Sequence, residues 1–454
     1  MHRGLWLALL LTGGLQAGEP CQIEVVDQES GWAVPLVELR TVHGVRLVTD
    51  NAGVIACDLP ELMGRESWFT VSGHGYEVPA DGFGYRGVRL TPEAGKSLRV
   101  EVQRTSVARR IGRITGGGLL AESQRCAEKG LAESGILGCD SVQNAVHRGK
   151  LYWIWGDSSV PHYPLGIFDT TAATSEIWPA ETLQPPLRPR LDYFRDEQRR
   201  PRGVAPLPGP GPTWLSALVS LPDAKGEPHL VATYVKVKPP LEGWQWGLTQ
   251  WNEARATFEP LRVLWTKDKD DGEPPPRPTG HAIPWRDADG KDWMLFGDPL
   301  PTLKVPATFE AWQDPTTWQV LRPQETLASA ADSNPVKPHS GSVAWSPNRK
   351  CWVTVFMQHF GKPSVFGEVW YAEAEQPTGP WGPAVKVLSH DNYTFYNPRI
   401  HAELLTADSP HLFFEGSYTV TFTENQQPTP RYEYNQLLYR LDLDDPELAG
   451  AQRR

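Results

Sequence analysis

Hydrophobic and polar residues alternate in short runs along most of the chain, and the runs come in pairs. One pair spans 141–146 and 151–157, with the polar turn Arg148-Gly149-Lys150 between them. Alternation at every second residue is typical of half-buried strands, and a short Gly-containing polar segment between two such runs is typical of a hairpin. Helical periodicity is nearly absent. The pattern therefore predicts an all-β protein built largely from hairpins.

The paired runs recur five times, beginning near residues 140, 213, 280, 339 and 397. The first, third and fifth copies end in Gly next to an acid, whereas the second and fourth end in Thr-Tyr and Val-Phe. A nearly constant spacing of roughly 60–70 residues is typical of repeat architectures such as propellers. We predict a five-bladed β-propeller over 115–445. Its innermost strands would bring acids that are distant in sequence into one pocket.

A second set of alternating runs, with a turn at 50–53, predicts a separate β-sandwich over 20–105. The segments 34–39, 49–53 and 72–76 resemble the carboxypeptidase regulatory-like, transthyretin-type fold. That resemblance implies a structural or adhesive module without chemistry of its own. The basic segment 104–113 is expected to be a solvated linker strand.

The first 17 residues predict a signal peptide. Arg3 supplies a positive start, 5–11 is a short apolar run, and 16–18 offers small residues for cleavage. The apolar run is too short to span a bilayer, and no later stretch approaches that length. We expect a secreted or periplasmic protein without a membrane span.

Five cysteines agree with export. Cys21 and Cys57 could pair, as could Cys126 and Cys139, which leaves Cys351 as an odd thiol. The sequence does not determine the connectivity.

Composition narrows the partners. The net charge of −10 argues against nucleic acid and anionic membranes. It also disfavours a strongly sulfated or uronate-rich substrate, unless arginines gather locally. The 19 tryptophans are expected mostly to fill space between blades, with a minority offering flat faces on which sugars stack.

Several segments resemble five-bladed propeller glycosidases, in particular the endo-D-arabinanase-like group first known as domain of unknown function 4185. Asp140 precedes the first strand and 153–157 reads Trp-Ile-Trp-Gly-Asp, with Ser158 where that group has Thr. The segments 369–381 and 414–440 resemble later blades of such propellers. The resemblance implies a carbohydrate-active propeller but does not name the sugar.

Glycoside hydrolysis generally needs one carboxyl held protonated as the acid and a second that acts as base or nucleophile. The candidate catalytic residues, chosen for their places near strand ends and in apolar settings, are Asp140, Asp157, Asp298 and Glu415. Glu415 follows two phenylalanines, a setting that would raise its pKa and suit a general acid. The structural alternatives are a turn cap for Asp140, a plain turn at a strand end for Asp157, and a structural Asp that belongs to the repeat for Asp298. Glu368 is a fifth carboxylate, more typical of a strand edge.

Three histidines occupy equivalent places at the inner strands of the predicted third, fourth and fifth blades. With one tryptophan, which could stack on a sugar, and one arginine, which could bind its oxygens, these histidines form the candidate substrate-binding set: Trp155, His281, His339, Arg399 and His401. The alternatives are satisfied core histidines, or histidines that hold water around an axial calcium or sodium ion. We predict no required cofactor, and no zinc-site spacing is present.

These residues are compatible with three functions. The first is a secreted glycoside hydrolase acting on a polysaccharide or oligosaccharide, including furanosides. The second is a polysaccharide lyase on the same propeller, with His281, His339, His401 and Arg399 as its catalytic set. The third is a non-catalytic glycan-binding surface protein. A lyase leaves an unsaturated sugar that absorbs ultraviolet light, whereas a hydrolase leaves only new reducing ends.

Overall fold

The structure is a computed structural model and describes residues 19–116, 134–362 and 364–451. Their regular secondary structure consists almost entirely of β-strands, which confirms the all-β prediction. The helical elements are short: α2 (Phe309–Gln313) and the 3-10 turns Ala180–Thr182, Pro315–Thr317, Ala402–Leu404 and Pro446–Gly450. None of the helices in the described ranges is long and apolar enough to cross a membrane.

The N-terminal part consists of two four-stranded sheets, ordered β4-β1-β8-β6 and β3-β2-β5-β7. Their strands are β1 (Cys21–Asp27), β2 (Glu38–Thr41), β3 (Arg46–Val48), β4 (Val54–Cys57), β5 (Ser67–Ser72), β6 (Tyr76–Glu77), β7 (Gly87–Leu90) and β8 (Ser97–Arg104). Alternate residues of both sheets, such as Ile23, Leu39, Phe69 and Val100, share one hydrophobic core. The alternation seen in the sequence is therefore the difference between core-facing and outward-facing positions.

Cys21 and Cys57 lie directly opposite each other on the antiparallel strands β1 and β4. Both are buried and carry free thiols, as does Cys139, and the free thiol of Cys351 is half-buried. The proposed Cys21–Cys57 bond is thus not formed, although its two partners are neighbours. Cys126 lies outside the described residues.

Within the described residues, the C-terminal part contains five four-stranded antiparallel sheets. The second, third and fourth are each built from consecutive strands, whereas the first omits β13 (Ser158–Val160) and β14 (Tyr163–Ile167), which pair with β10 (Gly138–Cys139) in a separate sheet. The first two sheets comprise β11 (Gln143–His147), β12 (Lys150–Trp155), β15 (Thr171–Ser175) and β16 (Asp192–Tyr193), then β17 (Thr213–Pro222), β18 (Pro228–Lys238), β19 (Glu242–Asn252) and β20 (Thr257–Thr266). The next two comprise β21 (Ile283–Arg286), β22 (Asp292–Gly297), β23 (Pro301–Pro306) and β24 (Gln319–Val320), then β27 (Pro338–Ser346), β28 (Cys351–Gln358), β29 (Glu368–Ala374) and β30 (Val385–Ser389).

The fifth sheet closes the set with a strand from the other end of the chain. It comprises β31 (Thr394–Ile400), β32 (His411–Thr419), β33 (Asn435–Asp442) and β9 (Arg109–Arg113), with β9 paired to β33. The first strands of neighbouring sheets lie together, since β11 contacts β17 and β27 contacts β31. Each of the five hairpin repeats found in the sequence coincides with the first two strands of one sheet. Short strands outside these sheets are β10 (Gly138–Cys139), β13 (Ser158–Val160), β14 (Tyr163–Ile167), β25 (Leu327–Ala328) and β26 (Pro335–Val336).

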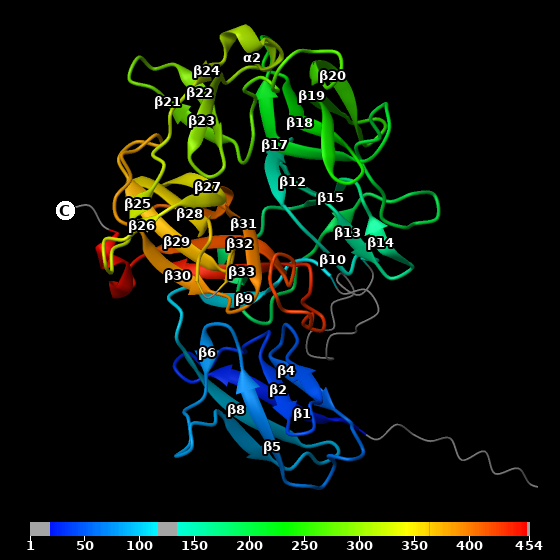
Figure 1. Cartoon of the computed structure of the whole chain (residues 1–454), viewed down its shortest axis with the longest axis vertical. Helices are drawn as coiled ribbons and strands as arrows, with labels where there is room; N and C mark the ends of the chain where they lie inside the picture. Colours follow the sequence, from blue (N-terminus) through cyan, green and yellow to red (C-terminus); the bar gives the residue numbers. More distant parts are fainter. Residues whose placement is uncertain (1–18, 117–133, 363, 452–454) are drawn as a thin grey trace, which may run out of the picture.

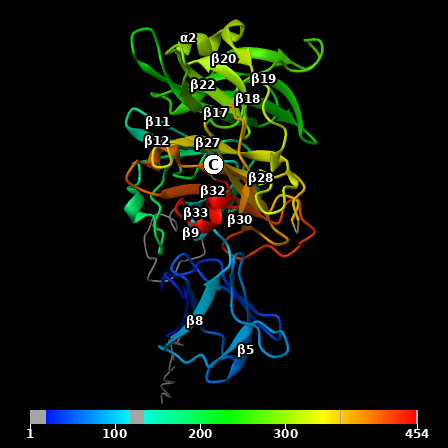
Figure 2. The same cartoon turned by 90° about the vertical axis from the view of Figure 1, so that its left-hand side faces the viewer.

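The basic segment 104–113 is not a solvated linker, and this corrects the expectation from the sequence. Its second half is β9, and Arg110 and Arg113 are only 1 % exposed. Their charges are accommodated because the guanidinium groups donate hydrogen bonds to backbone carbonyls, including Arg110 Nη1 to the His74 carbonyl at 2.7 Å. The N-terminal sheets lie directly against the fifth sheet in both views (Figures 1 and 2).

Candidate functional site

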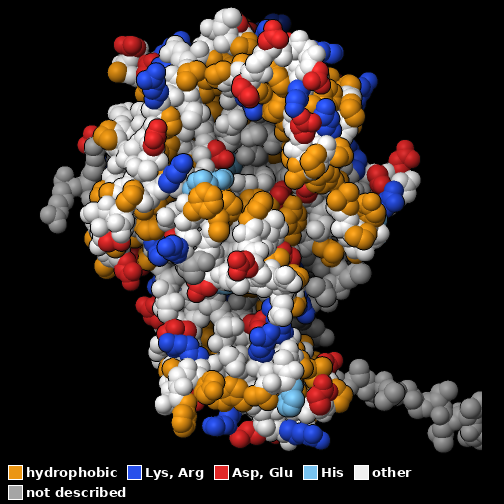
Figure 3. Space-filling model, in the orientation of Figure 1, with side chains coloured by type: hydrophobic (Ala, Val, Ile, Leu, Met, Phe, Trp, Pro, Cys, Tyr) orange, Lys and Arg blue, Asp and Glu red, His pale blue; other side chains and the backbone are white. Residues whose placement is uncertain are grey.

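A pocket of about 390 Å³ opens among the five C-terminal sheets. In the space-filling view the upper half of the molecule is hollowed between the sheets (Figure 3). All five sheets contribute to its lining, mostly from the beginnings and ends of their first two strands. The lining residues with reactive, polar or aromatic side chains are Asp140, Ser141, Gln143, Asp157, Trp214, Ser216, Thr233, Tyr234, Trp246, Arg277, Thr279, His281, Asp298, Ser340 and Asn397. Three of the four carboxylates that the sequence indicated as catalytic candidates therefore meet here.

Asp140 lies between β10 and β11 and is held by two tyrosines from the fifth sheet and the segment before β33. The hydroxyl groups of Tyr396 and Tyr434 donate to its Oδ2 atom at 2.5 Å and 2.8 Å. Burial raises the pKa of Asp140, while the two tyrosine hydrogen bonds act in the opposite direction. The carboxyl group is thus fixed in one orientation at the edge of the pocket.

Asp157 follows β12 and is the backbone neighbour of Asp140, whose amide donates to the Asp157 carbonyl at 3.3 Å. The indole Nε1 of Trp214 donates to Asp157 Oδ1 at 2.9 Å. Burial, followed by the charge of Asp140, raises the pKa of Asp157 to about 7. Two neighbouring carboxyl groups resist simultaneous ionisation, so a substantial fraction of Asp157 is still protonated at neutral pH.

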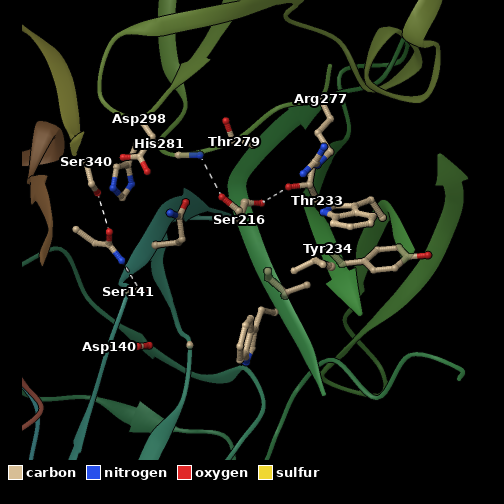
Figure 4. A pocket seen from close by; sticks show the side chains of 18 of the residues that line it. Asp140, Ser141, Ser216, Thr233, Tyr234, Arg277, Thr279, His281, Asp298 and Ser340 are labelled. Atoms are coloured by element: carbon tan, nitrogen blue, oxygen red, sulfur yellow. Dashed lines mark hydrogen bonds between the residues drawn. The ribbon is translucent and has the colours of Figure 1, made fainter. Parts of the chain in front are cut away.

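Asp298 and His281 come from the third sheet. Asp298 follows β22, and its Oδ1 accepts a hydrogen bond from the Gly341 amide at 3.0 Å. Burial raises the pKa of Asp298. The pKa of His281 falls to about 3, because burial and the nearby positive charge of Arg399 oppose its protonation. Figure 4 shows Asp298 and His281 together, with Asp140 some way below them.

A chain of hydrogen bonds joins the first strands around the pocket. Ser340 Oγ donates to Asn397 Oδ1 at 2.7 Å, and Asn397 Nδ2 donates to Ser141 Oγ at 2.6 Å. Ser141, Asn397 and Ala217 adopt left-handed backbone conformations with φ of 52°, 52° and 54°. Non-glycine residues in this region cluster at functional sites, where the surrounding structure offsets the strain.

Aromatic and cationic side chains occupy another part of the lining. The Trp214 ring meets Phe168 edge-on at 5.4 Å, and the guanidinium carbon of Arg277 lies 5.1 Å from the centre of the Trp246 ring. Figure 4 shows Arg277 beside Thr233 and Tyr234, away from Asp298 and His281. The pocket thus has an acidic region and an aromatic region that carries a positive charge.

Two predicted binding residues lie elsewhere. Trp155 is 1 % exposed and packs against Tyr193 with ring centres 5.4 Å apart. His339 is exposed and packs against His359 and Phe366, with ring centres 4.9 Å away in each case. Neither lines the pocket. The expectation that they contact a substrate there is not met, because Trp155 fills the core and the His339 ring packs against His359 and Phe366 outside the pocket lining.

The remaining predicted residues form a buried charged cluster behind the pocket. His401 contacts Glu415 at 3.1 Å and Glu403 at 2.8 Å, and Arg399 contacts Glu403 at 3.1 Å. Burial alone would raise the pKa of Glu403, but Arg399 and His401 lower it to about 2. Glu415 is 0 % exposed and faces this cluster instead of an apolar pocket. The sequence predicted Glu415 as a catalytic residue and Arg399 and His401 as substrate-binding residues. The structure places all three in this buried cluster and not in the lining of the pocket.

Several lining or supporting residues are not evident from the sequence. Tyr396 and Tyr434 carry no signal, because only the closure of the fifth sheet brings them to Asp140. The sequence gives a weak signal for Trp214 and Arg277, since each follows a proline-rich segment. Trp214 lies at the beginning of the first strand of the second sheet, and Arg277 precedes the first strand of the third sheet. Asp169 supports the site from behind Asp157: its Oδ1 accepts from the amides of Thr170 and Thr213, and burial raises its pKa to about 6.

Within the described ranges, no three His, Cys, Asp or Glu side chains are arranged to hold a metal ion. The axial calcium or sodium ion remains a prediction.

A scan against protein-family models finds no match, and no curated protein matches the chain. The solved structures to which this chain is similar include an exo-1,5-alpha-L-arabinanase from a bovine ruminal metagenomic library (TM-score 0.37, 12 % identity, covering 67 % of this chain and 93 % of that one). An arabinanase from Bacillus subtilis gives a TM-score of 0.35 and 10 % identity, and the match covers 66 % of this chain and 93 % of that one. A GH43 beta 1,3 galactosidase gives a TM-score of 0.40 and 8 % identity, and the match covers 74 % of this chain and 60 % of that one. Such low values leave the activity of this chain to be argued from its own pocket.

Proposed function

We propose that this chain is a glycoside hydrolase and that the five-sheet pocket is its active site. The observation that carries the proposal is that the carboxyl groups of Asp140, Asp157 and Asp298 line one pocket of about 390 Å³ together with the half-buried side chains of Trp214 and Trp246. Paired carboxyls with different proton affinities are what acid/base cleavage of a glycosidic bond requires. The five sheets are then the blades of a propeller, and the N-terminal sheets form a transthyretin-type sandwich.

Asp157 is the proposed general acid. With a pKa of about 7, a substantial fraction of Asp157 carries a proton at neutral pH, ready for transfer to the leaving oxygen as the bond from that oxygen to the anomeric carbon breaks. Asp140 keeps this proton affinity high through its charge, and its tyrosine hydrogen bonds hold it in position. It is therefore a positioning residue for Asp157.

Asp298 is the proposed base or nucleophile. It comes from a different sheet, and the Gly341 amide stabilises its ionised form. It would either remove a proton from the attacking water or attack the anomeric carbon itself, and the distance between the carboxyls in the substrate complex decides between these two. His281, neutral because of its low pKa, would hydrogen-bond a sugar hydroxyl.

The two alternatives have less support. Of the residues assigned to a lyase, only His281 lines the pocket, and burial raises the pKa of both nearby tyrosines, which makes them poor bases. A glycan-binding protein has no need for the raised pKa of Asp157, which is typical of catalytic sites. Export by the segment 1–17, a furanosidic substrate and an axial ion are further parts of the proposal.

Sugar release from a panel of polysaccharides, including arabinans and arabinogalactan, tests the proposal. We expect reducing ends without ultraviolet-absorbing products. Asp157→Asn and Asp298→Asn should each lower kcat by at least about 100-fold. Asp289→Asn, in an exposed turn, is the matched control and should leave the rate unchanged. Activity that survives both pocket substitutions would refute the assignment, and binding without turnover across the panel would favour the glycan-binding alternative.

A further inference from the structure

Arg277 is a positively charged residue presented into the pocket from a stiff segment. It lies between a run of three prolines at 274–276 and Pro278. Proline fixes its own φ and restricts the residue before it, so the backbone here has little freedom. The carbonyl of Pro278 also accepts a hydrogen bond from Thr233 Oγ1 at 3.1 Å. The side chain therefore starts from a fixed point on the pocket wall.

The guanidinium group of Arg277 has no acidic partner among the ion pairs that join described residues. One face lies over the ring of Trp246 at 5.1 Å, and one donor, Nη1, reaches the Pro275 carbonyl at 3.4 Å. Guanidinium carries five N–H donors, so most of its hydrogen-bonding capacity is unused by these contacts. Burial lowers its pKa, and no neighbouring carboxylate counteracts that effect. A half-buried, unpaired charge is costly for the free protein and indicates an external partner.

The position of Arg277 separates it from the catalytic carboxylates. In Figure 4 it lies beside Thr233 and Tyr234, whereas Asp298 and His281 lie on the other side of the pocket. A sugar unit whose anomeric bond meets the carboxylates would therefore have a neighbouring unit, or a far substituent, near Arg277. A planar guanidinium held by aromatic stacking matches the two oxygens of a carboxylate or a sulfate.

We propose that Arg277 makes the enzyme specific for a glycan that carries an anionic group, either the carboxylate of a uronic acid or a sulfate ester. The cleavage position relative to that group rests on the proposed hydrolase function, but the binding itself does not. The net charge of −10 taken alone disfavours such substrates. An anionic group that contacts Arg277 is attracted strongly, because this arginine is partly desolvated and has no acidic partner among the ion pairs of the described residues. This attraction outweighs the repulsion by the acidic surface residues, which are distant and screened by salt.

A glycan array provides the test. It would carry neutral arabinan and galactan, the uronates polygalacturonate, glucuronoxylan and alginate, and sulfated carrageenan. Binding is measured in an Asp157→Asn background, so that cleavage does not consume the glycans. The strongest ligand is then titrated calorimetrically beside its carboxyl-reduced or desulfated form, which distinguishes the two anion sources. Variants are Arg277→Gln, Arg277→Lys and, as a matched control, exposed Arg322→Gln.

We expect an anionic glycan to bind best and Arg277→Gln to weaken it by about 10-fold or more, since hydrogen bonds to charged groups are the strong ones. The neutral form should bind Arg277→Gln and the parent protein equally. Arg277→Lys should recover part of the affinity, because lysine keeps the charge but loses the paired geometry. Arg322→Gln should change nothing.

A neutral glycan as the best ligand, no binding of any anionic glycan, or anionic binding that is unaffected by Arg277→Gln would overturn the inference. The failure of each proposal is distinguishable. Hydrolysis of a neutral glycan that is insensitive to Arg277→Gln would leave the hydrolase standing and remove the anion site. Binding that depends on Arg277 but leads to no turnover would support the anion site and refute the hydrolase proposal.

Discussion

Asp157 is the residue through which the pocket responds most directly to pH. Its pKa is about 7 in the folded protein, against an ordinary value of 3.8, because of burial and then the charge of Asp140. A carboxyl with a raised folded pKa contributes stability that is fully present below its unfolded pKa and is lost as pH rises through its folded pKa. Asp157→Asn removes this contribution. We expect the melting temperature of the variant, relative to wild type, to be a few degrees higher at about pH 8 than at about pH 5.

Thermal melts at these two pH values measure the effect. Asp289→Asn is the control, since Asp289 lies in an exposed turn. If the difference between variant and wild type is the same at both pH values, Asp157 has an ordinary pKa, and its role as general acid at neutral pH is lost with it.

Trp214 controls the same proton from the other side. Its indole donor stabilises the ionised form of Asp157 and so lowers the pKa of that carboxyl. Trp214→Phe removes the donor and keeps the aromatic ring. Because a general acid works only while protonated, we expect the alkaline limb of the kcat/KM profile to move upward by about one pH unit. A limb that stays in place or moves downward would show that another group provides the proton.

The residues that could be predicted from sequence share one property, which is their position at a strand end. Asp140, Asp157 and Asp298 flank first or second strands, and such positions reach the pocket. Glu415 lies in the middle of β32, where its side chain is buried and contacts His401. Tyr396 could not be found, because it is separated from its partner Asp140 by 256 positions in the chain. The carboxyl groups at strand ends could therefore be found from local sequence, whereas the side chains that hold them in place come from distant parts of the chain.

At the scale of elements, the beginning of each first strand determines where the pocket residues lie. Gly280 precedes β21 with φ of 70°, and a Cβ atom there would overlap the carbonyl oxygen of Gly297. We expect Gly280→Ala to cost about 2–4 kcal/mol in the free energy of unfolding, from overpacking and left-handed backbone strain together. It should also displace His281 and reduce activity. Denaturant unfolding measures the first effect.

Gly290→Ala is the matched control. Gly290 has φ of 79° in the hairpin between β21 and β22, and nothing lies within 4 Å of its added Cβ. It should cost only the backbone term, about 1 kcal/mol. Equal losses in the two variants would mean that the close approach of Gly280 to Gly297 is absent.

The elements themselves were largely predictable, with one instructive exception. All five hairpin repeats are present, because alternation with a turn is a local signal. The sequence of β9 instead predicts a linker, since a run rich in arginine is usually solvated. Pairing with β33, more than 300 residues later, buries these arginines, and no local pattern reports such a pairing.

At the scale of the whole molecule, β9 has a second role, because it fastens the N-terminal sheets to the C-terminal ones. Arg110 on β9 donates to the carbonyls of Pro35 at 2.9 Å, Leu36 at 3.2 Å and His74 at 2.7 Å. Asn51 exchanges hydrogen bonds with the backbone of Arg113 at 2.9 Å and 3.0 Å. Leu36 and Val48 join the hydrophobic core of the C-terminal sheets. We therefore expect both parts to unfold in one cooperative transition.

Arg110→Met tests this coupling. The substitution preserves much of the side-chain volume but leaves three buried carbonyls without their donor, at a cost of about 3–5 kcal/mol in unfolding free energy. We expect calorimetry to resolve two transitions in the variant, because the contact between the parts is lost while each core remains. Arg99→Met is the control, since Arg99 is 57 % exposed and forms an ion pair with the similarly exposed Glu101. One transition at the wild-type temperature in Arg110→Met would mean that the apolar contacts of Leu36 and Val48 suffice, and that the buried arginine adds specificity without stability.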